Sequence, residues 1–372
     1  MDLKEVERQS RMCAACRKMC RHVCPTFFAW RSDSPTPHGR SLLVHQDAKN
    51  IRSLDERGIE VLYMCLECSH CLTWCLPEID VADIVETTRI RLVTEGRHPA
   101  ELSKLESAVK EHHNPFNEKH SERNNWLSIQ GEGETKIAYF SGCTAAYREK
   151  EIAQDAVSVL ASLGYTVVVS SEEWCCGSPL LRTGFVETAL EQARHNVEVF
   201  NSVEADEILV TCPGCYRVLT KDYPLHGLKI NKPVKHVAEL LYAHIDDLPV
   251  GEFEGNVAYH DPCHLGRHCG IYDQPRRILN KITGSRFVEM ERHGDNAMCC
   301  GNGAGLRTLF PEKAKTIGAE RIRHAKHVEA SILVTSCPFC KNMFVSQTQS
   351  DLKVLDLPEL VRVAQKSKKD QR

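Results

Sequence analysis

Two hydrophobic patterns alternate along the chain beyond residue 135. Longer stretches with apolar residues along one side, such as Glu151–Gly164 and Val186–Val203, predict helices. Short apolar runs rich in β-branched residues are typical of buried strands, and they cover Ile137–Phe140, Ile208–Val210, Val257–Tyr259 and Ile332–Thr335. Strands that alternate with helices indicate βαβ units and a parallel sheet.

The first part of the chain shows only helical patterns between its polar segments. They predict helices over Gly39–Asn50, Val81–Thr94 and Ala100–Glu111, the first with Leu42, Leu43 and Ala48 on its inner face. The polar stretch His112–Gly133, with breakers at Asn114–Pro115 and Gly131–Gly133, reads as a linker. The sequence therefore predicts an α+β protein: an α-helical domain with its linker over 1–125, followed by a duplicated α/β domain over 135–250 and 251–372.

Cysteines mark the duplication. Each copy carries one cysteine at the end of its first apolar run, then a Cys-Cys-Gly triplet, then a Cys-Pro-x-Cys pair after a β-branched run. In an open parallel sheet, ligands gather outside the carboxyl ends of the strands. Five distant thiols therefore converge in each copy: Cys143, Cys175, Cys176, Cys212 and Cys215 in the first, and Cys263, Cys299, Cys300, Cys337 and Cys340 in the second.

Composition narrows the choice of chemistry. The 372 residues carry a formal net charge of −3, which excludes a broad basic surface for nucleic acid. No apolar run is long enough to span a membrane, and the start lacks the apolar core of a signal peptide, so we expect a cytoplasmic protein. In such a chain, 19 cysteines indicate metal binding and not a disulfide framework. Only Cys269 stands outside the groups, and we expect it to be a small core residue.

Two further runs of cysteines precede the duplication. Cys65, Cys68, Cys71 and Cys75 have the spacing of a bacterial ferredoxin run, although Leu76 replaces its proline; Cys13, Cys16, Cys20 and Cys24, followed by Pro25, differ by one residue in the middle gap. In two-cluster ferredoxins the fourth cysteine of each run ligates the other cluster. The spacing thus predicts one cubane 4Fe–4S cluster on Cys13, Cys16, Cys20 and Cys75, and another on Cys65, Cys68, Cys71 and Cys24. Zinc is the weaker alternative, because zinc sites usually pair two CxxC units around a longer insert.

Two smaller signals are ambiguous. Gly301–Gly305 lacks the order of a dinucleotide-binding loop, and close backbone approach to a cluster explains it better, so we predict no flavin or NAD. His264 lies next to Cys263, and a histidine can deliver protons near neutral pH. A hydrogen bond from His264 to a cluster sulfur is an equally plausible role. Most other histidines, such as His112, His113, His324 and His327, lie in charged polar surroundings and are expected to be solvated.

At these motifs the chain resembles the heterodisulfide reductase family, specifically its D-type subunit. Asp261–Arg267, Cys299–Gly301 and Cys337–Cys340 look like its CCG signature, and Cys143–Tyr147 with Cys175–Pro179 look like the first copy. The resemblance implies a non-cubane 4Fe–4S cluster on the five cysteines of a complete CCG motif, and hence one or two such clusters here.

Three functions remain open from the sequence, and the complete cysteine sets favour the first. The first is a disulfide reductase of the heterodisulfide type, whose implied substrate is the coenzyme M–coenzyme B disulfide. Its donor or acceptor would be a membrane cytochrome b or a flavoprotein, and such a partner would hold the chain at the inner face of the membrane. The second is an electron-relay subunit between a flavoprotein dehydrogenase of the glycolate, lactate or glycerol-3-phosphate type and a quinone or cytochrome. The third is a zinc-stapled scaffold.

Overall fold

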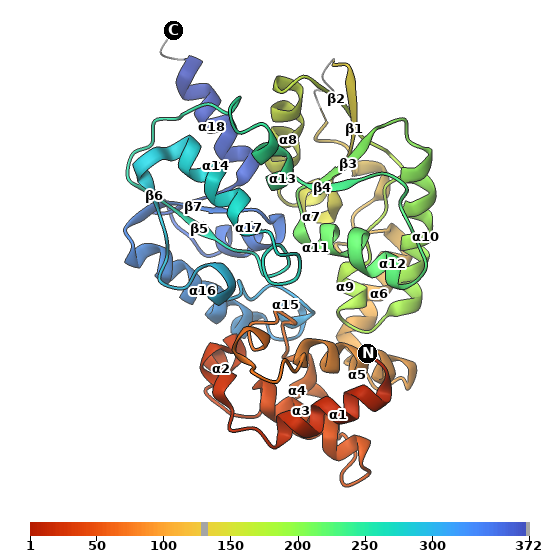
Figure 1. Ribbon diagram of the computed structural model, residues 1–372. Coiled ribbons are helices and arrows are strands. Elements are labelled where there is room, and N and C mark those ends of the chain that lie inside the picture. The colour runs from red at the N-terminus through yellow and green to blue at the C-terminus, as the bar shows by residue number, and fades with distance from the viewer. Residues whose placement is uncertain (128–132, 370–372) are drawn as a thin grey trace.

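The computed structural model describes residues 1–127 and 133–369. A helical part, red to orange in Figure 1, lies beneath two α/β parts that stand side by side. Each α/β part holds one four-stranded parallel sheet, as the alternating patterns predict. Within the described residues, no helix combines the length and the apolar character needed to cross a lipid bilayer.

The N-terminal part contains the three predicted helices and three more. Helix α5 has the predicted bounds, and α3 begins at Pro37, where Thr36 caps it by accepting a hydrogen bond from the Gly39 amide. The bounds are α1 (Leu3–Ala14), α2 (Pro25–Trp30), α3 (Pro37–Ala48), α4 (Glu56–Tyr63), α5 (Val81–Thr94) and α6 (Ala100–His112), with 3-10 turns η1 (Met19–Val23), η2 (Leu72–Trp74) and η3 (His120–Glu122).

The predicted inner face of α3 was partly wrong: Leu43 packs against the core, but Leu42 and Ala48 are exposed. Leu42 is 37% exposed, whereas Arg40, Ser41 and Val44 are buried. The helix turns a polar residue inward because Arg40 extends toward the cysteine run that precedes it, as described below. Hydrophobic periodicity cannot identify a buried face that contains an arginine.

The first α/β part, yellow to green in Figure 1, has the strand order β2-β1-β3-β4, all parallel. Its elements are β1 (Thr135–Phe140), α7 (Gly142–Tyr147), α8 (Lys150–Ser162), β2 (Tyr165–Val168), α9 (Ser178–Leu181), α10 (Val186–Ser202), β3 (Glu207–Val210), α11 (Pro213–Arg217), a π-helical turn η4 (Val218–Asp222), α12 (Tyr223–Leu225), β4 (Val234–His236) and α13 (Val237–Ala243).

The second α/β part repeats this topology with the order β6-β5-β7-β8. The long helices α10 and α16 correspond, with 17 residues each. The elements are β5 (Asn256–His260), α14 (Asp273–Thr283), η5 (Gly284–Arg286), β6 (Phe287–Val288), η6 (Gly294–Asn296), α15 (Leu306–Leu309), α16 (Pro311–His327), β7 (Ala330–Thr335), α17 (Pro338–Val345), β8 (Lys353–Asp356) and α18 (Leu357–Lys369).

Each sheet has a topological switch point between its two central strands. In the first sheet, β1 leads outward to β2 and the chain then crosses to β3, and β5 and β7 repeat this arrangement. Ligand sites form at such points, outside the carboxyl ends of the strands. The first cysteine of each copy follows β1 or β5, and the last pair follows β3 or β7, so both cysteine sets lie where the topology places a site.

Hydrophobic packing joins the three parts into one body. One core joins α1, α3 and α5 to the first sheet, a second lies between the two sheets, and a third joins α2 and α4 to the second sheet. The predicted linker also packs: Trp126 is buried between the sheets, and the ring of His113 stacks on Trp174 at 3.6 Å. Residues 128–132, which include part of the predicted Gly131–Gly133 breaker, lie outside the described chain.

Candidate metal centres

The cysteines are the natural starting point for the site. All nineteen are free thiols, and twelve of them are buried. Thiolates are soft ligands for zinc and for iron–sulfur clusters, and coordination keeps them deprotonated at neutral pH. The positions of the eighteen grouped cysteines therefore define the candidate centres.

The first group forms at the surface of the N-terminal part. Cys13 ends α1 and is buried, Cys20 on η1 and Cys75 after η2 are half-buried, and Cys16 is exposed. Burial raises the pKa of Cys13 to about 11, and the nearby Cys16 and Cys75 add to this. Burial likewise raises the pKa of Cys20 to about 12, with Cys13 and Cys75 contributing. The four residues predicted to share a cluster are thus neighbours.

The second group lies deeper. Burial raises the pKa of Cys71 well above its ordinary value, and Cys68, Cys65, Cys20 and Cys24 contribute in that order. The four cysteines of the predicted second set are therefore close together. Cys20 is near them as well, so the two N-terminal groups are adjacent.

Arg40 accompanies this second group, and sequence reasoning missed it. Its guanidinium is buried and donates to the Thr26 hydroxyl at 2.9 Å, the Val61 carbonyl at 3.2 Å and the Cys24 thiol at 4.0 Å. Within the described residues no carboxylate lies within salt-bridge distance of it. A buried guanidinium normally requires a counter-charge, and thiolates at this group would supply one.

The cysteines of the first repeat form a chain of contacts. Each thiol interacts with the next one in the order Cys143, Cys175, Cys176, Cys215 and Cys212. Gly142 lets the strand end come this close: its φ is 69°, and a Cβ there would stand 3.1 Å from the Cys215 sulfur. All five predicted thiols are thus brought together.

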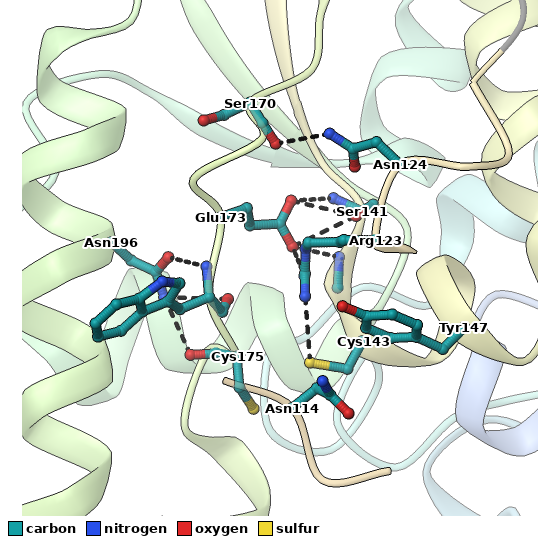
Figure 2. Close-up of polar contacts among 12 residues, drawn as sticks. Asn114, Arg123, Asn124, Ser141, Cys143, Tyr147, Ser170, Glu173, Cys175 and Asn196 are labelled. Carbon is teal, nitrogen blue, oxygen red and sulfur yellow. Dashed lines mark hydrogen bonds and ion pairs between the residues drawn. The ribbon is translucent and has the colours of Figure 1, made fainter. Parts of the chain in front are cut away.

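A buried ion pair lies beside Cys143, the first cysteine of this series (Figure 2). The Arg123 guanidinium lies between Glu173 and Cys143, and it donates to the Cys143 thiol at 3.8 Å and to the Glu173 carboxylate. Glu173 also accepts from the backbone amides of Ser141 at 2.8 Å and Gly142 at 2.9 Å. Both charged side chains are essentially fully buried. Arg123 belongs to the segment that the sequence suggested was only a linker.

The second repeat has the same order of contacts. The thiols interact in the order Cys263, Cys299, Cys300, Cys340 and Cys337. The sulfur atoms of Cys300 and Cys340 are 3.2 Å apart. One difference is that His260, Cys300 and Cys340 place ligand atoms within 4.8 Å of one another. All three side chains are buried, and His260 was not among the predicted site residues.

Two contacts join the groups into a series. The thiol of Cys68 in the N-terminal part interacts with that of Cys299 in the second repeat. The thiol of Cys337 in the second repeat interacts with that of Cys212 in the first. The order in space is therefore first N-terminal group, second N-terminal group, second repeat, first repeat.

Comparisons with known proteins agree with this arrangement. The cysteine-rich CCG domain family matches residues 137–220 and 257–345. The D-type subunit of the dihydromethanophenazine:CoB–CoM heterodisulfide reductase of Methanosarcina mazei is 33% identical, over 95% of this chain and 93% of its own length. The chain belongs to this family of heterodisulfide reductase subunits. It is accordingly an iron–sulfur oxidoreductase.

Two other relatives are covered over a smaller share of their own length. The B-type subunit of the fumarate reductase (CoM/CoB) of Methanothermobacter marburgensis is 33% identical over 82% of this chain and 62% of its own length. An EtfAB:quinone oxidoreductase of Syntrophomonas wolfei is 28% identical over 82% of this chain and 47% of its own length.

The residues present fit the iron–sulfur clusters that the family implies. Each repeat offers five thiols, one more than the four ligands of a structural zinc site. Buried cations stand beside the thiols, with Arg40 at Cys24 and Arg123 at Cys143. Such cations offset the negative charge of several thiolates, which burial would otherwise make unfavourable.

The glycine run behind Cys300 makes one close approach to another part of the protein. Gly301 has φ 90°, and a Cβ there would stand 2.6 Å from the Ala314 carbonyl of α16. Gly301 thus approaches a neighbouring helix closely, and the approach of the glycine run to a cluster stays a prediction. The expectation that His324 is solvated was wrong: His324 is buried, beside Arg321.

His264 lies at the second repeat, half-buried, with its ring 4.8 Å from that of His268. Its Nδ1 is enclosed and has no hydrogen-bond partner among the described residues. Burial, followed by His268 and nearby arginines, lowers the pKa of His264 well below its ordinary value. Cys269 is half-buried, and burial raises its pKa to about 11.

Proposed function

We propose that this chain is the disulfide-cleaving subunit of an iron–sulfur oxidoreductase complex. The reaction is R–S–S–R′ + 2 e⁻ + 2 H⁺ → RSH + R′SH, with electrons delivered by a partner, and it also runs in reverse. The coenzyme M–coenzyme B disulfide is the substrate that the family suggests. The observation that supports the proposal is the interaction between the thiols of Cys212 and Cys337, which makes the two complete five-cysteine sets adjacent.

The cysteine sets divide into four centres in this proposal. Cubane 4Fe–4S clusters are assigned to Cys13, Cys16, Cys20 and Cys75 and to Cys65, Cys68, Cys71 and Cys24, and non-cubane clusters to the five cysteines of each repeat. When bound, these groups supply single electrons and iron that accepts sulfur ligands. Cleavage of a disulfide needs two electrons, so two adjacent centres suit the reaction.

The protein's own residues provide the surroundings. Arg40 and Arg123 place positive charge beside Cys24 and Cys143, and burial of the thiols keeps water away from them. Arg217, on α11 just beyond Cys215, has a buried Nη1 with no partner in the described parts of the chain. That donor would suit an anionic group on the disulfide.

His264 is proposed to supply a proton to a departing thiolate. Because its lowered pKa leaves the ring mostly neutral near pH 7, the rate that depends on this residue is expected to increase as the pH falls. Replacing it with alanine is expected to slow disulfide cleavage by about 10²-fold, within the usual range for a general acid. Turnover is measured across pH with reduced benzyl viologen as donor. A His264→Gln variant that keeps most of the activity would contradict the proton-donor role, because glutamine can donate a hydrogen bond to a cluster sulfur but cannot act as an acid.

The partner is proposed to dock where Cys16 reaches the surface. Three apolar side chains stand exposed close to this group in the sequence: Met19 at 65%, Trp74 at 45% and Leu76 at 90%. The partner would be a membrane cytochrome b or a flavoprotein, which would place the chain at the cytoplasmic face of a membrane.

Changing Leu76 to glutamate is expected to weaken electron delivery by the native partner at least about tenfold, because it buries a charge in the contact. Turnover with reduced benzyl viologen should stay unchanged, since a small dye does not need the contact. Val250→Glu, at a residue exposed to 64% after α13, is the matched control. Equal effects of the two variants would contradict this docking site.

An electron relay is the second candidate. The likeness to an EtfAB:quinone oxidoreductase favours it, since that relative's name mentions no disulfide. The test is to add the coenzyme M–coenzyme B disulfide, and simple thiol disulfides, to the anaerobic complex reduced with viologen. Oxidation of viologen by a disulfide supports cleavage; oxidation by a quinone but by no disulfide supports the relay.

A further inference from the structure

The two repeats differ at the last residue of their first strand. β1 ends in Phe140 and β5 ends in His260, and both side chains are buried. The rest of the cysteine arrangement is the same in the two copies. A histidine at this point therefore gives the second site a polar group that the first site lacks.

Hydrogen bonding fixes the tautomer of this histidine. Arg321, on α16, donates from Nε to His260 Nδ1 at 3.0 Å, so Nδ1 carries no proton and the neutral ring carries its proton on Nε2. Nε2 is buried and has no hydrogen-bond partner among the described residues. A ring nitrogen of His260 lies within 4.8 Å of the Cys300 and Cys340 sulfurs, with Cys300 as the interacting thiol.

Hydrogen bonds also fix the position of Arg321. It is fully buried, its Nη1 donates to the Arg292 carbonyl at 2.7 Å, and no carboxylate of the described chain is within salt-bridge distance. A buried cation without a carboxylate is costly. It polarises the imidazole and makes Nε2–H a stronger donor.

The first repeat has no counterpart to this pair among its described residues. Asn196 occupies in α10 the place of Arg321 in α16, the eleventh residue of each helix, and its amide donates to the Cys175 carbonyl at 3.0 Å. Phe140 packs on Phe200, with ring centroids 5.2 Å apart. The first repeat instead has Arg123 at Cys143, the first cysteine of its chain of thiols, whereas His260 faces the middle cysteine of the second repeat.

We propose that His260, oriented by Arg321, is a positioning residue that donates a hydrogen bond from Nε2 to the Cys300 thiolate and thereby raises the reduction potential of the second centre. Hydrogen bonds to cluster sulfurs withdraw electron density and are an established means of tuning such potentials. The two repeats would then hold the same ligands at different potentials. The inference rests on an iron–sulfur centre in the second repeat and needs no particular substrate.

The test uses the intact iron-loaded protein labelled with ¹⁵N-histidine. Pulsed electron paramagnetic resonance is expected to show a weak histidine nitrogen coupling that disappears in His260→Phe, which copies the first repeat. The same variant should retain its iron and show a lower midpoint potential in a redox titration. His260→Gln, which keeps an N–H donor, should recover much of that potential. Arg321→Met should lower the potential in the same direction.

Two results would overturn the inference. An unchanged midpoint potential in both His260→Phe and Arg321→Met would show that no tuning hydrogen bond exists. A strong nitrogen coupling, with selective loss of iron in both His260→Phe and His260→Gln, would make His260 a metal ligand. Neither measurement depends on disulfide turnover, so failure of the proposed function would be seen separately, as absence of turnover in the unaltered protein.

Discussion

Replacing Cys176 or Cys300 with serine is expected to abolish disulfide cleavage, a loss of about 10³-fold or more, because the two repeats act as one unit. Each cysteine stands at the middle of its chain of thiols, in contact with neighbours on both sides. For the same reason, the double variant should be no slower than either single one. Viologen-driven turnover and iron content are the measurements.

Cys269→Ser is the matched control for this experiment, since this thiol lies outside the four groups. It should leave iron content and turnover unchanged. The spectra of the N-terminal clusters should persist in all these variants. If either single variant lost iron from its repeat and yet cleaved the disulfide at the normal rate, paired action of the repeats would be excluded.

Arg123→Met is expected to destabilise the protein by about 3–5 kcal/mol, because it leaves Glu173 as a buried charge without its partner. The double variant Arg123→Met with Glu173→Gln should recover part of this loss, since it removes both charges. The shift of the urea midpoint, followed by far-ultraviolet circular dichroism and by cluster absorbance, measures the effect.

The Arg148–Glu118 pair serves as the control for charge pairing at a surface. Its side chains are 36% and 35% exposed, and the N–O distance is 2.6 Å. Arg148→Met should therefore cost no more than about 1 kcal/mol. If Arg123→Met and Arg148→Met behaved alike, the buried pair would have no special part in holding Cys143.

The sequence predicted the framework of this protein well, for a local reason. Cysteine spacing within a run, and strand and helix periods, are properties of neighbouring residues. Helix α5 and the duplicated parallel sheets could therefore be predicted directly. The switch-point rule then correctly brought Cys143 and Cys212 to one edge of a sheet, although a large part of the repeat separates them.

What the sequence did not reveal are buried polar residues whose partners are distant. Arg40, Arg123 and Arg321 look like ordinary surface residues, because arginine is usually exposed. Each is buried only because tertiary packing brings a thiol or a histidine to it. For the same reason, the packing of the predicted linker through Arg123 and Trp126 could not be predicted. The Phe140 to His260 difference was visible, but only the fold shows that it faces Cys300.

The asymmetry between the repeats bears on how a duplicated site divides its work. Arg123 acts on the first cysteine of one repeat, and His260 faces the middle cysteine of the other. Identical ligand sets placed in different electrostatic surroundings acquire different redox properties. Duplication followed by such divergence would let two adjacent centres take unequal parts in one reaction.

The most direct measurement is electron paramagnetic resonance on the anaerobically purified, fully iron-loaded protein, oxidised in the presence of coenzyme M or coenzyme B. We predict a paramagnetic species that depends on the added thiol and is lost in Cys176→Ser or Cys300→Ser. A loaded protein that gives no thiol-dependent signal with any thiol, or a preparation that contains zinc in place of iron, would contradict disulfide cleavage by the paired repeats.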